Sequence, residues 1–364
     1  MNHEITSERP SIIEDIRSEI RGIRTRPPRK KKPVPPPDFS QSRRLFTVCT
    51  GNRWMELGQR LPVQKRLFGD FWRQGELCIL FAAANAGKSI LAVQIADALS
   101  RRRKPAPFAP RALPVKVLYI DFELSTAQFC QRYNGPGGLY SFSDNFYRAQ
   151  FNLEPGLCPD PSTYNDLVFD AIEQKIHLTN ATVLIIDNIT CLRGGTESAL
   201  VALRLMQSLK ALKSDLNLSV LVLAHTPKRR SPGRSLSADD LHGSKLLMNF
   251  ADSAFTIGTG GNPSGQCYLK QIKQRNTEQL YGENNVCLCR IVRRDDGFLR
   301  FKFEGYSAER LQLPVPPPRC HPLAEKIATL AARGLSQRQI SRKLHISLGL
   351  VNGLVRKPER SESR

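Results

Sequence analysis

The residues with the clearest chemical potential are 82–89, which read AAANAGKS. An apolar run typical of a strand, 77–81, precedes them, and a helix-forming run, 90–99, follows. A strand, a glycine-containing loop ending in Lys-Ser and a helix, in this order, form the context that a P-loop requires. A Gly-Lys-Ser triplet that had arisen by chance would lack this context, so we predict a site for ATP and Mg²⁺.

Each part of this loop has a defined task in such a site. Backbone N–H groups of the loop and of the helix N-terminus face the phosphates, while Lys88 reaches the β- and γ-phosphates and Ser89 ligates Mg²⁺. Gly87 lets the backbone approach closely. The first position is Ala82, where the usual pattern has Gly. The predicted nucleotide-binding residues are Ala82, Ala83, Ala84, Asn85, Ala86, Gly87, Lys88, Ser89 and Ile90.

An acidic residue closes another apolar run. Residues 183–186 are Val-Leu-Ile-Ile, and Asp187 follows them. A carboxylate at the end of a buried strand, beside Ser89, can hold the coordination shell of Mg²⁺. A strand-ending turn acid is the alternative for this residue, and the P-loop pattern favours the metal-binding interpretation.

Polar side chains also follow two other apolar runs, and the carboxyl ends of parallel strands are where ligands gather. Glu123 lies just past 117–121, where a carboxylate can orient and activate water for attack on the γ-phosphate. Asp121 is a nearby competitor for this role, and either acid could instead be a solvated loop residue. His225 follows 219–224 and could hydrogen-bond the γ-phosphate, although a lone histidine is often structural.

The elements that must position these residues alternate along the chain. Continuous apolar runs predict strands of a parallel sheet covered on both faces, with right-handed crossovers through helices. Later runs alternate in polarity with a period of two and predict antiparallel strands that extend the sheet. The sequence therefore predicts an α/β fold with a mostly parallel sheet. The predicted parallel strands are 77–81, 117–121, 182–187, 219–224 and 253–257; the helices are 88–103, 163–175 and 198–212; the antiparallel strands are 266–273, 286–293 and 299–303.

Two Pro-rich breaks divide the chain. Residues 1–45 form a basic arm with a short amphipathic piece, 12–23, followed by a run of Pro, Arg and Lys that cannot build a core. The second break lies within 311–320. We therefore predict a disordered arm, a large ATPase domain at 46–310, a linker and a small helical domain at 321–364.

The composition is strongly basic. The 364 residues contain 54 Lys and Arg against 33 Asp and Glu, a formal charge of +21. Such an excess makes a polyanion the expected partner, nucleic acid first, with plain solubility as the alternative. The nine cysteines form no CxxC pair, which indicates reduced thiols in a reducing compartment rather than a zinc site. With no signal-peptide core at the N-terminus and no run of about 18 apolar residues, we expect a cytoplasmic protein with no membrane partner.

Several of these segments together resemble the RecA-fold hexameric ATPases, especially DnaB-type helicases and plasmid RepA-type helicases, over residues 68–303. The loop with alanine in its first position looks like the DnaB-type loop. Residues 123–132, ELSTAQFCQR, are similar to the family's E-M-S-x-x-Q-x-x-x-R segment, whose Glu is the catalytic base. Residues 182–189 look like its Walker B strand, and 241–252 resemble the G-S and A-D segment of RecA-fold and KaiC-like proteins. The resemblance implies ATP hydrolysis in a homo-oligomeric ring, expected to be a hexamer.

The most specific part of the resemblance is 272–276, IKQRN, which looks like the family's K-Q-R-N segment. There the Lys and Arg reach the γ-phosphate of the neighbouring subunit, so the resemblance makes Lys273 and Arg275 finger candidates. The alternative is a pair of basic side chains on one face of an edge strand. Three departures concern helicase activity more than ATP hydrolysis: the arm is short and Pro-rich, His225 stands where Gln is frequent, as in the RepA type, and Thr277 replaces Gly.

A basic loop follows His225. Residues 227–234, PKRRSPGR, occupy the position at which loops of RecA-fold rings line the central channel and touch the DNA strand without reading its sequence. A solvated loop is the alternative, and 193–197 is a weaker second channel candidate. The candidates for contact with single-stranded DNA are Lys228, Arg229, Arg230 and Arg234.

The C-terminal segment has the periodicity of three short helices, 323–333, 335–344 and 348–357, with Ser336 as an N-cap. It resembles the helix-turn-helix of resolvases and sigma-like regulators, whose third helix enters the major groove of duplex DNA. A protein-docking module is the alternative, because His345 replaces the usual turn Gly and two glycines weaken the third helix. The predicted core residues are Ile340, Leu344, Ile346 and Val351.

Together these features predict Mg²⁺-dependent ATP hydrolysis coupled to DNA binding or translocation, as in a RepA-like helicase that replicates a plasmid or other mobile element. Two alternatives stay open at this point. One is a non-helicase RecA-like ATPase in recombination, repair or partition. The other is an ATP-gated DNA-binding regulator that acts through 321–364.

Overall fold

The computed structural model describes most of the chain, which divides into two compact units, Met1–Pro62 and Val63–Arg364. Among the predicted features, the arm at 1–45, the loop at 193–197 and the first three basic residues of the channel loop lie outside the described residues. The described residues are 47–101, 114–152, 164–189, 199–226, 233–241, 245–259, 265–314 and 323–355.

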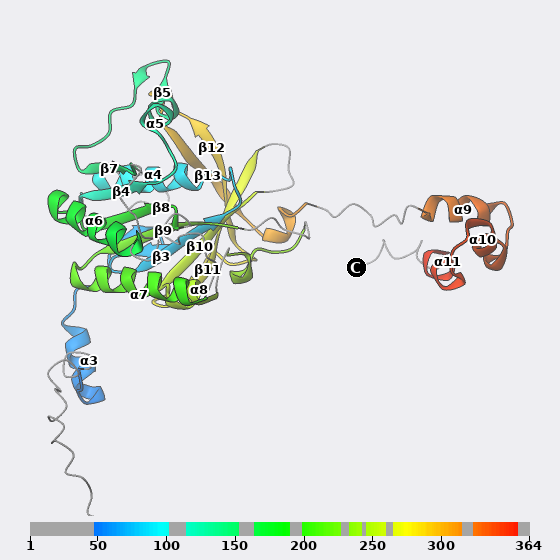
Figure 1. Cartoon of the computed structure of the whole chain (residues 1–364), viewed down its shortest axis with the longest axis horizontal. Helices are drawn as coiled ribbons and strands as arrows, with labels where there is room; N and C mark the ends of the chain where they lie inside the picture. Colours follow the sequence, from blue (N-terminus) through cyan, green and yellow to red (C-terminus); the bar gives the residue numbers. More distant parts are fainter. Residues whose placement is uncertain are drawn as a thin grey trace, which may run out of the picture. The chain divides into compact units, whose positions relative to one another are not determined.

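The described part of the second unit contains a nine-stranded sheet (Figure 1). The neighbours from β10 to β7 are parallel, and β11, β12 and β13 continue the sheet antiparallel. The predicted α/β fold with a largely parallel sheet and an antiparallel extension is therefore confirmed. In sheet order the strands are β13 (Leu299–Ser307), β12 (Val286–Arg293), β11 (Gln266–Gln274), β10 (Ser253–Thr259), β3 (Leu77–Ala82), β9 (Ser219–His225), β8 (Val183–Asp187), β4 (Val117–Asp121) and β7 (Phe146–Gln150).

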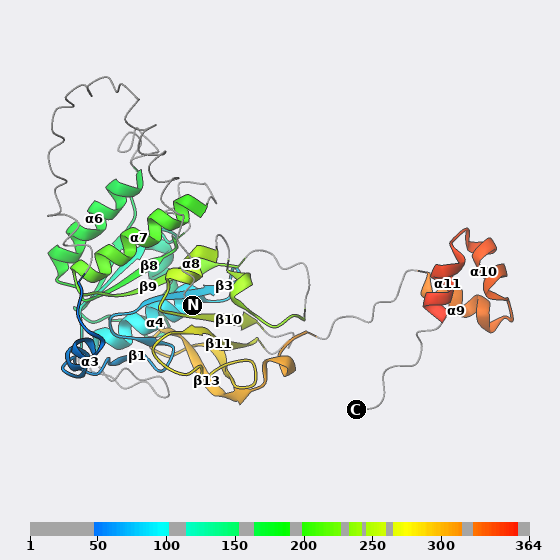
Figure 2. The same cartoon turned by 90° about the horizontal axis from the view of Figure 1, so that it is seen from below.

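Helices cover both faces of this sheet. In Figure 2, α4 (Lys88–Ser100) lies on one face, and α6 (Tyr164–Thr179) and α7 (Ala199–Asp215) lie on the other, together with α8 (Lys245–Phe250). Because strand side chains alternate between faces, β3 supplies both cores: Cys78, Leu80 and Ala82 pack with α4, whereas Leu77, Ile79 and Phe81 pack with α6, α7 and α8. Burial on both faces explains why the parallel strands are continuously apolar.

The ends of the long helices differ from the predicted ones. α4 ends at Ser100, before the predicted residue 103, because the backbone of Arg101 is extended (φ −113°, ψ 158°). α6 and α7 instead run past their predicted ends. Asn180 and Asn217, which follow them, adopt left-handed conformations (φ 52° and 50°) that commonly terminate a helix.

Several short elements were not predicted. The sequence pattern did not indicate β7, because its residues, FYRAQ, are mostly half-buried at the edge of the sheet and mix aromatic with polar side chains. α5 (Thr126–Arg132) begins at a capping box in which Ser125 and Gln128 bond each other's backbone N–H groups. The remaining short elements are α3 (Gly51–Gln59) in the first unit, and β1 (Arg66–Phe68), β2 (Trp72–Arg73), β5 (Asn134–Gly135), β6 (Gly138–Leu139), η2 (Ala238–Asp240) and η3 (Glu309–Leu311).

The C-terminal residues 323–355 form three short helices, α9 (Ala324–Ala332), α10 (Gln337–Leu344) and α11 (Leu348–Val355). Ile340 and Val351 are buried in a small core, and Leu344 and Ile346 pack against it, as predicted. Ser336 caps α10 through a hydrogen bond from the N–H of Gln339, and His345 takes the left-handed position (φ 52°) that glycine usually fills. Whether this domain binds DNA stays a prediction.

None of the described helices combines the length and the apolar character needed to cross a membrane.

Candidate active site

The loop between β3 and α4 is the centre of the candidate site. Ala83, Ala84 and Asn85 are exposed at its tip, and Asn85 and Gly87 both adopt left-handed conformations (φ 61° and 91°). A Cβ atom on Gly87 would lie 2.7 Å from Cδ1 of Ile291 and 2.9 Å from Cζ of Phe301. The antiparallel extension therefore packs directly on the loop, and only glycine fits at this position.

Lys88 begins α4, and its side chain is buried although it carries a charge. Nζ donates hydrogen bonds to the carbonyl oxygens of Ala82 (3.1 Å) and Ala83 (3.0 Å) and lies 3.2 Å from Nδ1 of His225. Burial lowers the pKa of Lys88, although the charges of Glu123 and Asp187 act to raise it. The ammonium group is thus held among oxygen atoms that a phosphate could replace.

Asp187 ends β8 in a fully buried position. The hydroxyl of Tyr119 donates a hydrogen bond of 2.5 Å to its Oδ2. Burial raises the pKa of Asp187 to about 6, although hydrogen bonding from Ser89 and from Tyr119 acts to lower it. A carboxyl group so deep in the protein needs a cation or a proton to be stable.

The donor set fits Mg²⁺. Among the described residues, Oδ1 of Asp187 is a buried oxygen without a hydrogen-bond partner, and the hydroxyl of Ser89 is close enough to affect this carboxyl group. Mg²⁺ prefers such oxygen ligands and usually binds through one or two side chains together with substrate phosphates. No group of three or more His, Cys, Asp or Glu residues in the described ranges could hold a metal ion by itself. Ser89 and Asp187 are the residues whose oxygen atoms would hold such an ion.

Glu123 lies beside His225, across the site from the loop. Oε1 of Glu123 is 3.3 Å from Nε2 of His225, and it accepts a hydrogen bond from the side-chain amide of Asn188. Nδ1 of His225 faces the ammonium of Lys88, and Nε2 lies 3.3 Å from Oε1 of Glu123 and 2.9 Å from the amide nitrogen of Asn188. The site therefore forms a chain of contacts from Lys88 through His225 to Glu123.

The rival acid, Asp121, is fully engaged elsewhere. Its Oδ1 accepts hydrogen bonds from the backbone N–H groups of Glu123 (3.0 Å) and Leu124 (2.9 Å), and its Oδ2 lies 2.9 Å from Nε of Arg148. Asp121 therefore holds the turn after β4 in shape, which leaves Glu123 as the candidate for activating water.

Lys273 and Arg275 lie far from the loop of their own chain. Lys273 pairs with Ala254, which pairs with Ile79, three residues before Ala82 on β3. Three residues of strand span about 10 Å, and Arg275 lies further still. Their side chains bind the end of α8: Nζ of Lys273 donates to the carbonyl of Met248 (2.6 Å), and a guanidinium N–H of Arg275 donates to that of Asn249 (2.5 Å). β11 lies between β10 and β12, but its register with β12 covers only Gln266–Leu269, so the part that carries Lys273 pairs with β10, and Arg275 follows the end of the strand.

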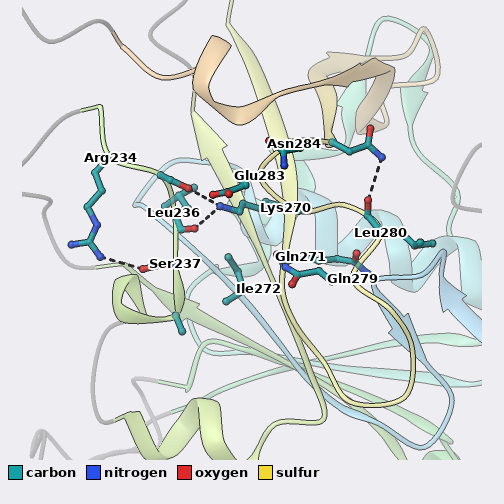
Figure 3. Close-up of a pocket in the computed structure, with 14 residues that line it drawn as sticks. Arg234, Leu236, Ser237, Lys270, Gln271, Ile272, Gln279, Leu280, Glu283 and Asn284 are labelled. Atoms are coloured by element: carbon teal, nitrogen blue, oxygen red, sulfur yellow. Dashed lines mark hydrogen bonds between the residues drawn. The ribbon is translucent and has the colours of Figure 1, made fainter.

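Of the four DNA-contact candidates, only Arg234 is among the described residues. It is exposed and donates a hydrogen bond to Oγ of Ser237 (3.3 Å) at the rim of a hollow of about 680 Å³ (Figure 3). Behind this segment, Lys270 is buried and donates to Oγ of Ser235 and to the carbonyl of Leu236. The segment that follows the predicted channel loop is therefore anchored to β11.

Three residues of the candidate site were not predicted from the sequence. Tyr119, Arg148 and Asn188 bind Asp187, Asp121 and Glu123 through side-chain hydrogen bonds. Asn188 could have been found from its place directly after Asp187 at the end of an apolar run. Tyr119 lies inside a buried strand, where an aromatic residue is expected for packing alone.

Comparison with known families agrees with this geometry. Residues 44–231, just over half of the chain, match the family model of the AAA domain. The matched range contains the loop and the three candidates Glu123, Asp187 and His225, and it ends before Lys273 and Arg275. No curated protein matches the sequence.

Proposed function

The chain belongs to the AAA-domain family of P-loop ATPases, and on this premise we propose that it is a ring-forming DNA-dependent ATPase, most like the RepA-type helicases of plasmids and other mobile elements. The observation that carries the proposal is the convergence of Lys88, Asp187, Glu123 and His225 at the carboxyl ends of four strands.

Hydrolysis in this site is mainly a matter of positioning and charge stabilisation. Lys88 and the loop N–H groups bind the phosphates, while Ser89 and Asp187 hold Mg²⁺, which neutralises charge on the phosphate oxygens when it is bound. The carboxylate of Glu123 orients a water molecule and accepts its proton as the water attacks the γ-phosphorus. The bond between the γ-phosphorus and the bridging oxygen breaks, and ADP leaves with that oxygen.

Assembly completes the site in this proposal. Lys273 and Arg275 cannot reach their own loop, as the register of β11, β10 and β3 requires. The resemblance to RecA-fold rings implies that a neighbouring copy supplies this pair, from the end of its β11, to this chain's γ-phosphate. The proposed homo-oligomer, a hexamer by resemblance, therefore hydrolyses ATP only when its subunits contact one another.

DNA is the proposed polymer partner. The formal charge of +21 favours a polyanion, and the basic segment 227–234 directly follows His225, which contacts both Lys88 and Glu123. A change at the γ-phosphate could thus be transmitted to the segment that holds Lys228, Arg229, Arg230 and Arg234. The small C-terminal domain would add contacts to duplex DNA.

A size-resolved ATPase assay tests the proposal. Material of known mass from light scattering is assayed with and without single-stranded DNA, and Lys88→Ala serves as the inactive reference. We expect hydrolysis by the oligomer, stimulated by single-stranded DNA, and strand separation on a forked duplex. An oligomer without ATPase activity in both conditions contradicts the proposal.

The two alternatives give different results in the same assay. A non-helicase ATPase of recombination, repair or partition hydrolyses ATP but leaves the fork intact. An ATP-gated regulator binds duplex DNA tightly even as Lys88→Ala and loses most of this affinity when 321–364 is removed. The helicase proposal instead expects affinity for single strands to depend on nucleotide and on the basic loop, with a salt dependence that weakens as its charges are removed.

A further inference from the structure

Asn188 directly follows Asp187 and contacts both Glu123 and His225 in the candidate site. Its side chain is buried, with 2% exposed. The amide nitrogen donates to Oε1 of Glu123 and lies 2.9 Å from Nε2 of His225. It therefore contacts the two side chains whose roles depend most on orientation.

The other groups around Glu123 explain why a neutral donor is needed there. Asp121 from β4 and Asp187 from β8 both place negative charge near the site, Arg148 from β7 pairs with Asp121, and Lys88 from α4 places a cation close enough to interact with Glu123. A carboxylate in this position would repel Glu123, and a second cation would compete with Lys88 for the phosphates. An amide can fix one oxygen of Glu123 without changing the net charge of the pocket.

We propose that Asn188 is the positioning residue of Glu123: its amide fixes one carboxylate oxygen, so that the other is free to face the water that attacks the γ-phosphate. This role rests on the proposed function of Glu123. Nε2 of His225 lies 3.3 Å from the same oxygen, and Nδ1 of His225 lies 3.2 Å from Nζ of Lys88. Glu123 alone, half-exposed at a loop, would otherwise sample several rotamers.

A double-mutant cycle in the full-length protein tests this role, because a residue that acts through Glu123 loses its effect when Glu123 is changed. Asn188→Leu keeps the approximate size of the side chain and removes the donor. We expect it to lower kcat for ATP about tenfold with KM within about twofold. In the Glu123→Gln background the same substitution should lower the residual rate, measured with radiolabelled ATP in single turnovers, less than twofold. Asn284→Ala, a change on an exposed loop outside the site, is the control for substitution of an asparagine.

A second variant separates positioning from packing. Asn188→Ser leaves a cavity but keeps a hydroxyl donor. If Asn188 positions Glu123, kcat should be higher for Asn188→Ser than for Asn188→Leu. If Asn188 serves only packing, the order of the two kcat values should be reversed. Two results overturn the inference. One is that Asn188→Leu lowers the rate of hydrolysis by the same factor in the wild-type and the Glu123→Gln backgrounds. The other is a higher kcat for Asn188→Leu than for Asn188→Ser. If Glu123→Gln itself hydrolyses ATP at the wild-type rate, the proposed role of Glu123 fails first, which is a distinguishable result.

Discussion

The ammonium nitrogen of Lys88 lies 3.2 Å from Nδ1 of His225, so the first residue of α4 and the last residue of β9 are in direct contact. This contact and the loop carbonyls of Ala82 and Ala83 give Nζ of Lys88 three hydrogen-bond partners. A γ-phosphate must draw Lys88 away from at least one of these partners. In the proposed function, His225 would register this change, because it also faces Glu123.

Lys88→Ala should abolish hydrolysis. The variant removes the only cation that the described residues place against the loop carbonyls, and loss of such a preorganised charge typically costs about 10²- to 10³-fold in kcat. Steady-state phosphate release measures the effect, and fluorescent-nucleotide titration measures the accompanying loss of affinity. Lys302→Ala, which changes an exposed lysine of β13, is the matched control and should keep the wild-type rate. Retention of more than about a tenth of the rate by Lys88→Ala contradicts the assignment.

Asp187→Asn should stabilise the nucleotide-free protein while it removes Mg²⁺-dependent hydrolysis. Burial raises the pKa of Asp187 to about 6, whereas a free Asp has about 3.9. The folded state therefore binds the proton more tightly than the unfolded state. The stability that this proton contributes is fully present below about pH 4, and it is lost as the pH rises to about 6. At pH 7.5 the ionised carboxylate costs up to about 3 kcal/mol, which the neutral amide avoids.

Thermal unfolding in EDTA measures this difference. At pH 7.5 the midpoint of Asp187→Asn should lie several degrees above that of the wild type, and at pH 4 the two should converge. Addition of Mg²⁺ and a non-hydrolysable ATP analogue should stabilise the wild type and leave the variant almost unchanged. A variant less stable than the wild type at pH 7.5 would show that the carboxylate is stabilised by partners other than Mg²⁺.

The candidate residues that could be predicted from the sequence are those in which a characteristic residue type stands at the end of an apolar strand. Gly87, Lys88, Ser89 and Asp187 follow from local patterns, because a P-loop and a strand-ending acid are each encoded within a few residues. The mostly parallel sheet followed from the alternation of apolar runs and helices, whereas the order of its strands came from the structure.

The choice between Asp121 and Glu123 needed the structure. Asp121 ends β4 and Glu123 follows it two residues later, and only the contacts of Arg148 and of the turn N–H groups show that the carboxylate of Asp121 is occupied. Arg148 lies on β7, an edge strand whose mixed composition hides it from periodicity arguments. Contacts between residues distant in sequence, such as Asn188 with Glu123, leave no local pattern at all.

Glu309→Ala should destabilise the large domain by about 3–5 kcal/mol, because it leaves Lys270 buried without its counter-charge. The carboxylate of Glu309 accepts hydrogen bonds from Nζ of Lys270 (2.5 Å), the hydroxyl of Tyr268 (2.9 Å) and the N–H of Leu236 (2.8 Å). Although burial acts to raise it, these bonds hold the pKa of Glu309 below its usual value. Chemical denaturation measures the loss.

A double change distinguishes the charge effect from lost packing. Lys270→Met together with Glu309→Gln removes both charges, and it should recover most of the stability that Glu309→Ala loses. Because this ion pair anchors the segment after 227–232 to β11, the single variant should also be cleaved faster by protease near that segment. If Glu309→Ala and the wild type have the same free energy of unfolding, the buried ion pair of Lys270 and Glu309 is not required for stability.

Arg275→Ala should be inactive alone and recover activity when mixed with Lys88→Ala subunits. In its own chain Arg275 binds the carbonyl of Asn249 and lies 3.7 Å from Asp252, at the opposite end of β3 from the loop. In a mixed ring, roughly a quarter of the interfaces combine an intact loop with an intact arginine from the neighbour. Phosphate release after subunit exchange should therefore rise well above that of either variant. Arg310→Ala, an exposed arginine outside the site, should stay fully active alone. Activity of Arg275→Ala in isolation would show that the site is complete within one chain, and a mixture without activity would assign Arg275 to the support of α8 only.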